Sequence, residues 1–210
     1  MSTNVKNNIP NGKKKAGRPR RFDETVALEA AMEVFWAKGF EGASLEDLTN
    51  AMGINRPSLY AAFGDKNALF SKAIDHYGET IASPAQVGFH NEASIEKAVT
   101  AYFELALEGQ CRNGDCAKGC FIAGMVGLED GCMPELQAAI AKQATATHQG
   151  FVERFDREIK KGRLSPTPDA EARATLMMDL MQAQSYRART GATRKMLEDQ
   201  IEMRVRAVLA

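Results

Sequence analysis

Arg56, Ser58 and Tyr60 lie close together in the sequence, and their side chains are of types that contact phosphates and the edges of bases. The planar guanidinium of Arg56 can bind the O6 and N7 atoms of one guanine together. Leu59 and Phe63 are four residues apart, which gives the same segment an apolar face if it is helical. We therefore predict a short helix with one face toward a core and a polar face toward nucleic acid.

A second short helix is predicted immediately before the first. Ser44 can cap this helix, and Asp47, three residues later, supplies the acid of a capping box. The apolar residues Leu45, Leu48 and Met52 then recur on one face. The segment thus has a defined start and a single apolar side.

The connection between the two helices is short and contains a glycine. Gly53 can take the positive φ that a sharp reversal demands, and Ile54 can fill the angle between the helices. Asn55 can cap the next helix, and Pro57 fits its first turn, where a backbone N–H has no intrahelical partner. Two short helices joined in this way predict a helix-turn-helix.

Two further helices flank this pair. Asp23 can cap the earlier one, which we expect to end at Gly39, and the later one follows Lys66. The later helix should connect the DNA-binding unit to the rest of the chain. The supporting apolar residues are Leu28, Ala31, Met32 and Phe35 in the earlier helix and Leu69, Phe70, Ala73, Ile74 and Tyr77 in the later one.

The chain resembles the TetR family of bacterial transcriptional regulators in three stretches between Gly17 and Tyr77: GRPRRFD, ALEAAMEVFWAKGFEGASLEDL and MGINRPSLYAAFGDKNALF. The resemblance implies an all-α fold, with an N-terminal three-helix helix-turn-helix DNA-binding domain and a helical C-terminal domain for ligand binding and dimerisation. Two positions depart from the family pattern. Thr49 stands where alanine is usual, and Trp36 is larger than the common residue; both bear on packing more than on function.

Mapped position by position, the resemblance implies that residues 56–58 lie near base edges, while Ser44, Tyr60 and Lys66 contact phosphates. Lys66 stands at the start of the predicted fourth helix, and a helix amino terminus favours anions. The complete predicted DNA-binding set is Ser44, Asn55, Arg56, Pro57, Ser58, Tyr60 and Lys66, with Arg18 and Arg20 from the amino-terminal segment.

The charge distribution also favours a nucleic-acid partner. The 210 residues carry 27 basic and 27 acidic side chains, yet the first 21 residues hold seven basic side chains and no acidic one. A flexible basic arm can release counterions from double-stranded DNA and reach into a minor groove. The alternative is a solvated tail that only aids solubility. An architectural protein that binds DNA without sequence preference would be basic throughout, whereas everything after the arm is acidic on balance.

Residues 83–93, SPAQVGFHNEA, interrupt the helical periodicity with proline and glycine, so we predict a domain boundary there. The predicted organisation is a flexible basic arm (1–21), a helix-turn-helix DNA-binding domain with its connecting helix (22–82), and a helical effector-binding and dimerisation domain (83–210). Within the last domain, the pattern predicts helices near residues 95–106, 120–131, 134–162, 169–189 and 197–208.

The predicted helix over residues 169–189 is apolar on most of its circumference, and such a helix must be covered on several sides. We therefore expect the last two helices to pair with their copies in a homodimer, as a four-helix bundle. The dimer would present two reading helices to a palindromic operator. The alternative is a closed monomeric core. The apolar residues concerned are Leu176, Met177, Met178, Leu180 and Met181.

The resemblance further implies a pocket for a small-molecule effector among the middle helices. Apolar walls with one or two polar groups suit such a site. Aromatic and methionine stripes at helical spacing are also ordinary core, and for His148 a satisfied core histidine is the main alternative. The candidate effector-binding residues are Phe103, Phe121, Met125, His148, Phe151 and Met178.

Four cysteines fall within 22 residues, near Arg112 and Lys118. Neighbouring cations can make a thiolate reactive, so a redox or electrophile switch and a soft metal such as Cu(I) are alternatives to an organic effector. The spacing C-x4-C-x3-C-x11-C matches no paired zinc motif, and some of these residues can simply be buried. The thiol-sensing candidates are Cys111, Cys116 and Cys120; the fourth cysteine is Cys132.

Other classes of function find little support. No phosphate-binding loop, G-x-S-x-G elbow or H-E-x-x-H motif is present, so we expect no enzyme, no cofactor and no resident metal, and a thiol enzyme is the least supported alternative. The chain has no signal-peptide core and no apolar run of about 18 residues, so we expect a cytoplasmic protein without a membrane partner. The sequence predicts a regulator, most simply a repressor released from its operator by an effector.

Overall fold

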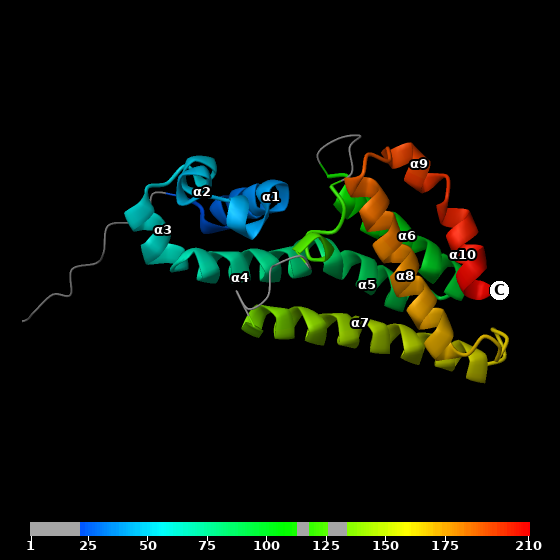
Figure 1. Ribbon diagram of the computed structural model, residues 1–210. Helices are drawn as coiled ribbons and strands as arrows, with labels where there is room; N and C mark the ends of the chain where they lie inside the picture. Colours follow the sequence, from blue (N-terminus) through cyan, green and yellow to red (C-terminus); the bar gives the residue numbers. More distant parts are fainter. Residues whose placement is uncertain (1–21, 113–117, 126–133) are drawn as a thin grey trace, which may run out of the picture.

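The computed structural model describes residues 22–112, 118–125 and 134–210, and these residues form helices joined by short turns (Figure 1). The N-terminal unit contains α1 (Glu24–Gly42), α2 (Leu45–Met52), α3 (Arg56–Phe63) and α4 (Lys66–Tyr77). A π-helical turn (Gly78–Ala82) leads into α5 (Ser83–Asn91) and α6 (Ile95–Gln110). A 3₁₀ turn (Ala123–Met125) precedes α7 (Pro134–Lys160), α8 (Ala170–Arg189), α9 (Arg194–Glu198) and α10 (Ile201–Leu209).

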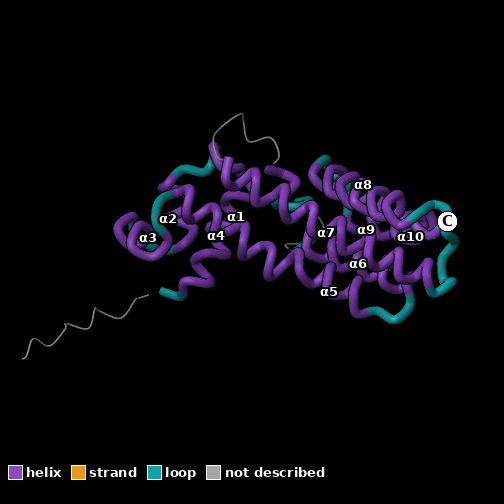
Figure 2. Tube along the Cα trace, turned by 90° about the horizontal axis from the view of Figure 1, so that it is seen from below, coloured by secondary structure: helices purple, strands orange, loops and turns teal. Residues whose placement is uncertain are grey.

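The molecule is elongated, with α1–α3 at one end and α8–α10 at the other (Figures 1 and 2). The helix α4 runs from the first group toward the second and passes through the π-helical turn into α5. The all-α expectation is confirmed, as is the helix-turn-helix followed by helical C-terminal residues.

Two clusters of buried side chains form the core. The first lies among α1–α4 and includes Phe35, Leu59 and Phe70; the second lies among α5–α10 and includes Phe89 and Phe103. Each cluster is lined by the apolar stripe of its helices, so burial of those stripes holds each group together. The two clusters divide between the π-helical turn and α5.

Two expectations of local structure are wrong. Residues 83–91 are helical rather than irregular, because Pro84 lies in the first turn of α5, where a missing N–H costs nothing. Gly39, expected to end the first helix, instead kinks it: its φ of 73° and ψ of 173° interrupt α1, which resumes as far as Gly42.

The helix expected over residues 197–208 is divided into α9 and α10. Gln200 turns the chain between them, and its side-chain oxygen accepts hydrogen bonds from Arg187 and Arg204. In the stretch predicted as a helix over residues 120–131, the described part contains only the short 3₁₀ turn.

The helix α8 is less apolar than its sequence suggested. Its buried side includes Arg173 and Gln184 beside Met177. The Arg173 guanidinium is satisfied by backbone carbonyls, among them that of Val208 at 2.6 Å. Leu176 remains 36% exposed, so part of the apolar surface of α8 faces outward.

Candidate nucleic-acid interface

The helix α2 begins with the predicted capping box. Ser44 Oγ accepts a 3.0 Å hydrogen bond from the Asp47 backbone N–H, and the Asp47 carboxylate accepts a 3.1 Å bond from the Ser44 N–H. Gly53 ends the helix with φ 64° and ψ 28°, the left-handed conformation that glycine adopts without strain. Asn55 then caps α3, because its side-chain oxygen accepts a 2.9 Å bond from the Ser58 N–H.

These caps fix which side of α3 faces outward. Leu59 is fully buried and Phe63 is 4% exposed, so the apolar side packs on the N-terminal cluster. Arg56 and Pro57 are exposed, Ser58 is half-buried, and Tyr60 is 50% exposed. The α3 side chains that were predicted to meet DNA therefore lie on the outer side of this short helix.

A lysine ties the start of α2 to the end of α1. Lys38 Nζ donates a 2.6 Å hydrogen bond to Asp47 Oδ1, so Asp47 serves both the capping box and an ion pair. The hydrogen bonds from Lys38 and Ser44 lower the pKa of the Asp47 carboxyl to about 2. A carboxylate that remains charged over a wide pH range keeps the α1–α2 connection in place.

Lys66 is the first residue of α4 and is half-buried. Its Nζ lies 4.3 Å from the centre of the Phe40 ring, a cation–π distance. Lys66 therefore lies beside the helix-turn-helix, while its own contact is with α1. Arg18 and Arg20 of the predicted arm lie outside the described residues.

Residues 118–125, here called the junction segment, connect the N-terminal helices with α8. Phe121 is fully buried, with its ring centre 5.7 Å from that of Trp36 and 5.5 Å from that of Tyr77. The Tyr77 hydroxyl donates a 3.2 Å hydrogen bond to Cys120 Sγ, and the Cys120 N–H donates a 2.7 Å bond to Ser185 Oγ of α8. One segment thus contacts α1, α4 and α8.

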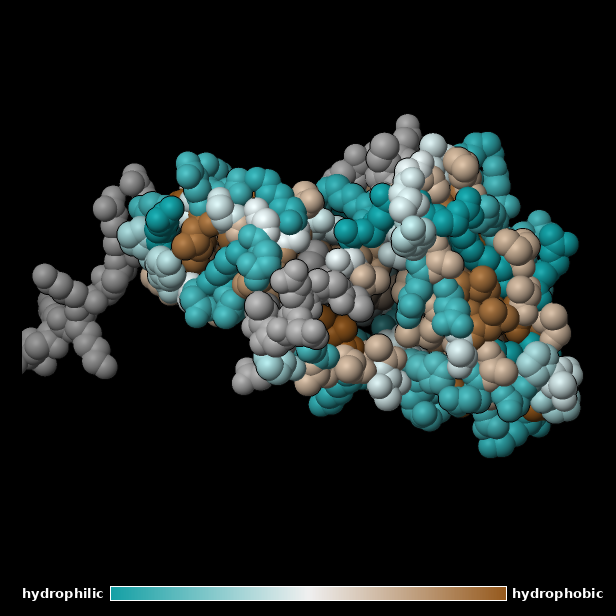
Figure 3. Space-filling view, in the orientation of Figure 1, coloured by the Kyte–Doolittle hydropathy of each residue, from teal (hydrophilic) through white to brown (hydrophobic). Residues whose placement is uncertain are grey.

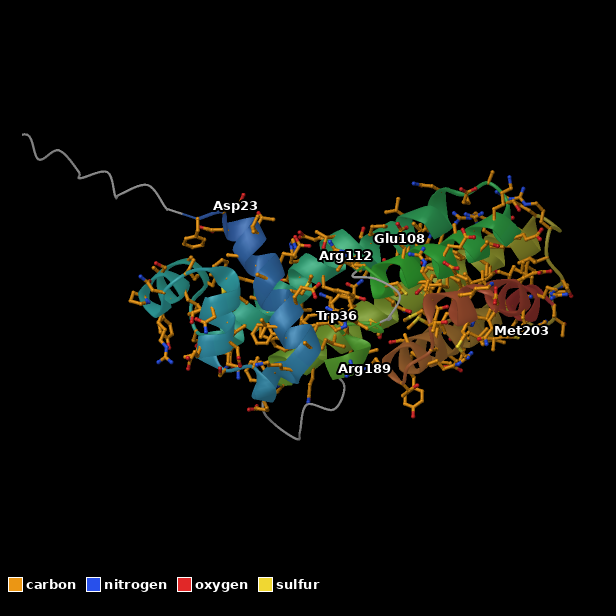
Figure 4. The ribbon with its side chains drawn as sticks, turned by 90° about the horizontal axis from the view of Figure 1, so that it is seen from above. Asp23, Trp36, Glu108, Arg112, Arg189 and Met203 are labelled. Carbon is orange, nitrogen blue, oxygen red and sulfur yellow. The ribbon has the colours of Figure 1, made fainter. Side chains whose placement is uncertain are left out.

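Two ion pairs lie along α1 at the same place. Lys118 Nζ is 2.5 Å from Glu33 Oε2, and the Arg112 guanidinium, just after α6, is 2.8 Å from Glu29 Oε1. Figure 4 shows Arg112, Trp36 and Arg189 in the middle of the molecule, between the N-terminal and C-terminal helices. This region joins the candidate interface to the rest of the chain.

The structure does not bring the six candidate effector residues together. Phe121 belongs to the N-terminal cluster, whereas Phe103 and Phe151 are fully buried in the C-terminal one, with Met178 packed against it. The Met125 side chain lies outside the described residues. The aromatic candidates thus make ordinary core contacts, the alternative that the sequence left open.

His148 is half-buried on α7 and makes a polar contact with α8. Its Nε2 lies 3.2 Å from Thr175 Oγ1 and 3.8 Å from Glu171 Oε1. This position is at the edge of the α7–α8 contact rather than inside an apolar wall.

A groove of about 630 Å³ lies between α6 and the α9–α10 pair. Leu107, Ile201 and Val205 contribute apolar surface to it, and Arg194 and Arg206 line it. None of the six candidate effector residues lines this groove. Its acidic residues are Glu96, Glu104, Glu108, Glu198 and Glu202.

The cysteines are placed differently from one another. Cys111 is buried at the end of α6, and Cys120 is half-buried in the junction segment. Cys116 and Cys132 lie outside the described residues. In the part of the chain that the structure describes, no group of three or more His, Cys, Asp or Glu residues is arranged to hold a metal ion.

Sequence reasoning missed the partners of several residues that it had noticed. The Phe40 ring under Lys66 and the Tyr77 hydroxyl on Cys120 join residues distant in sequence, 43 positions apart in the second case. Gly39 indicated a turn just before Phe40, but the spacing could not reveal which side chain the ring would meet. Among the described helices, none has the length and apolar character needed to span a membrane.

Comparison with known proteins agrees with this architecture. The family model described as "Bacterial regulatory proteins, tetR family" matches residues 27–73, which cover most of α1, all of α2 and α3, and the first part of α4. The HTH-type transcriptional repressor ComR of Escherichia coli (strain K12) is 33% identical over 186 residues, covering 86% of each chain.

Solved structures extend the likeness to the whole fold. The TetR family transcriptional regulator CifR, in a cysteine-substituted form complexed with a 26-base-pair operator DNA, is 34% identical with a TM-score of 0.78, over 90% of this chain and 99% of that one. A second such CifR complex is 31% identical with a TM-score of 0.81, over 91% and 99% of the two chains. The capped α2–α3 pair and the likeness along nearly the full length lead to one conclusion: the chain belongs to the TetR family of bacterial regulatory proteins.

Proposed function

We propose that this protein is a transcriptional repressor that binds a palindromic operator as a homodimer and releases it when a small-molecule effector binds. One observation carries the DNA-binding part of the proposal. The helix α3 buries Leu59 while Arg56 and Tyr60 stay exposed, in a chain that is 34% identical to a regulator complexed with operator DNA.

In this proposal, the residues on α3 and around it have different tasks. Arg56 reads a guanine through its fork of donors, helped by Pro57 and Ser58 near base edges, while Asn55 holds the start of the helix. Tyr60, Ser44 and Lys66 contact phosphates, and Arg18 and Arg20 add contacts from the arm. Phosphate contacts fix the register, whereas base contacts select the sequence.

The DNA-binding proposal is tested by selecting bound duplexes from a random library and then measuring affinities at fixed salt. Arg56→Ala should reduce the preference for the selected over a scrambled duplex, since a bidentate base contact is worth about 1–3 kcal/mol of discrimination. Lys66→Met should weaken binding to both duplexes alike. Lys97→Ala, which removes an exposed charge on α6, is the control and should change neither. Equal losses for all three variants on both duplexes would contradict the assignment.

The proposed dimer uses the last helices. Tyr186 on α8 is 68% exposed, and Met196 and Met203 on α9 and α10 are 50% and 51% exposed. Figure 3 shows apolar surface over α8 and α10. Such a face is typical of an interface between subunits. We expect wild type to sediment as a dimer and Tyr186→Glu as a monomer, while Val87→Glu, at an exposed apolar residue on α5, remains dimeric. A dimeric Tyr186→Glu variant would place the interface elsewhere.

The effector is proposed to act among the C-terminal helices, where Phe103, Phe151 and Met178 share one cluster. An effector can release DNA only by preferring one of two dimer geometries. Screening compounds for release of a labelled operator identifies it. If Phe151→Leu and Met178→Ala leave the affinity of the protein for that effector unchanged, this cluster is not the effector site.

A thiol-based switch of the same fold is a second candidate, favoured by the hydrogen bond between Tyr77 and Cys120. Addition of Cys120 Sγ across the double bond of a maleimide, with the thiol proton passing to the neighbouring carbon, would displace the Tyr77 hydroxyl from Cys120. We expect maleimide treatment to reduce operator binding in wild type and not in Cys120→Ser. The same loss in Cys120→Ser would exclude Cys120 as the switch.

A further inference from the structure

Lys66 stands at the amino terminus of α4, directly after the capping residue Asp65. It is the first residue of α4, and a helix amino terminus carries a partial positive charge that disfavours a cation. The first turn of α4 holds no acidic residue, and the Asp65 side chain is used to cap the Ala68 N–H at 2.8 Å. The helix dipole therefore acts against the charge of Lys66, and the neighbouring Asp65 carboxylate acts in its favour.

The Phe40 ring supplies a further stabilising contact. Lys66 Nζ lies 4.3 Å from the ring centre, and the negative potential on the face of an aromatic ring attracts an ammonium group. The ring itself is held firmly: Phe40 is 7% exposed, and its ring centre is 4.9 Å from that of Phe70 and 6.1 Å from that of Phe35. The kink at Gly39 comes immediately before Phe40 and directs the chain there.

A ring and a carboxylate restrain a lysine in different ways. Lys38 gives a hydrogen bond to Asp47, whereas Lys66 has no carboxylate within ion-pair distance among the described residues. A cation–π contact occupies only the side of the ammonium group that faces the ring, so the N–H donors on the other side remain available to phosphate oxygens. The ring also limits the conformations of a long side chain before binding, which reduces the entropy lost when a phosphate is contacted.

We propose that Phe40 is a positioning residue for DNA binding, which holds the Lys66 ammonium ready at the start of α4 for a phosphodiester group of the duplex. This inference rests on the proposed function. It assigns to a nearly buried aromatic of α1 a role in affinity for every sequence, with no role in sequence preference. The alternative is that Phe40 serves only as core.

A double-mutant cycle distinguishes the two roles. Affinities for the selected and scrambled duplexes are measured for wild type, Phe40→Leu, Lys66→Met and the double variant. We expect Phe40→Leu to weaken binding to both duplexes about threefold to fivefold when Lys66 is present. In the Lys66→Met background, where no charge is left for the ring to position, the same substitution should weaken binding by less than about 1.5-fold.

Losses by the same factor in both backgrounds would overturn the proposal, because a purely structural role does not depend on Lys66. The salt dependence gives a second readout. Loss of one phosphate contact should lower the log–log salt slope by about 1 in Lys66→Met, and by part of that in Phe40→Leu. An unchanged salt slope in Phe40→Leu would also contradict the proposal.

A substitution that keeps the shape of the Phe40 ring distinguishes loss of the cation–π contact from loss of folding. Replacing Phe40 with 3,4,5-trifluorophenylalanine keeps the ring in the core while weakening the negative potential on its face. We expect binding to both duplexes to weaken about twofold to threefold in the Lys66 protein and to stay unchanged in Lys66→Met. Full affinity with the fluorinated ring would overturn the proposal. Equal binding of wild type to selected and scrambled duplexes would instead contradict the proposed function.

Discussion

The Tyr77 hydroxyl, at the end of α4, donates a 3.2 Å hydrogen bond to Cys120 Sγ in the junction segment. Burial, and then the nearness of Cys120, raises the pKa of Tyr77 well above its ordinary value, so the hydroxyl keeps its proton and remains a donor. The Cys120 N–H in turn bonds to Ser185 of α8. Cys120 therefore links α4 to α8.

Replacing Tyr77 by phenylalanine keeps the ring against Trp36 and Phe121 and removes only this hydrogen bond. We expect the free energy of unfolding to fall by about 0.5–1.5 kcal/mol, the usual net value of one hydrogen bond, as measured by urea denaturation. Tyr60→Phe is the control, since Tyr60 is half exposed, and should leave stability unchanged. Equal stability of Tyr77→Phe and wild type would show that the bond contributes nothing measurable.

The glycine between α2 and α3 is expected to resist substitution for a backbone reason alone. Gly53 has φ +64°, and a Cβ there would meet nothing within 4 Å, so Gly53→Ala should cost about 1–2 kcal/mol of strain without a clash. Gly78→Ala is the matched control. Gly78 has helical φ and ψ and equally open space, so alanine should be neutral or stabilise by up to about 1 kcal/mol. Thermal unfolding of both variants checks the difference.

The ion pair of Asp47 predicts a pH dependence of stability. Because folding lowers the pKa of Asp47 to about 2, from an unfolded value of about 3.9, its contribution is complete above about pH 4 and is lost as the pH falls toward 2. We expect wild type to be more stable than Asp47→Asn at about pH 6 and to lose that advantage in this acidic window. Denaturant unfolding at a series of pH values checks it; a difference that does not vary with pH would contradict the prediction.

Gly119 tests the close contact between the junction segment and α8. Its φ is +74°, and a Cβ would lie 2.7 Å from the Ser185 carbonyl oxygen and 2.6 Å from Arg189 Cγ. Gly119→Ala therefore combines backbone strain with a clash, and should cost about 1–3 kcal/mol more than Gly162→Ala. Gly162 has a similar φ of +69° with nothing within 4 Å. Similar melting temperatures for the two variants would mean that the junction segment shifts away at little cost.

The sequence predicted the helix-turn-helix well because its signals are local. Ser44 with Asp47, Gly53 and Asn55 each act within a few residues, so their roles follow from spacing alone. The predictions that were wrong depend on contacts between helices distant in sequence. Gly88 looked like a loop residue, yet it stands within α5 because a Cβ there would lie 2.7 Å from Leu105 Cδ1 of α6.

Phe121 is a second case of the same kind. Its apolar character was evident, but nothing near it in the chain indicates that its ring would pack on Trp36 of α1 rather than line a pocket among the C-terminal helices. The DNA-binding set and the effector set remain predictions at the level of individual residues. Periodicity identifies a buried face, whereas the partner of that face depends on how separate helices meet.

The π-helical turn at Gly78–Ala82 joins α4 to α5 without a break, so 26 residues from Lys66 to Asn91 form one rod about 40 Å long. A displacement of α5 would therefore be carried along the helix to Lys66 at its other end. The π-helical turn, with Pro84 directly after it, is the place where such a helix bends.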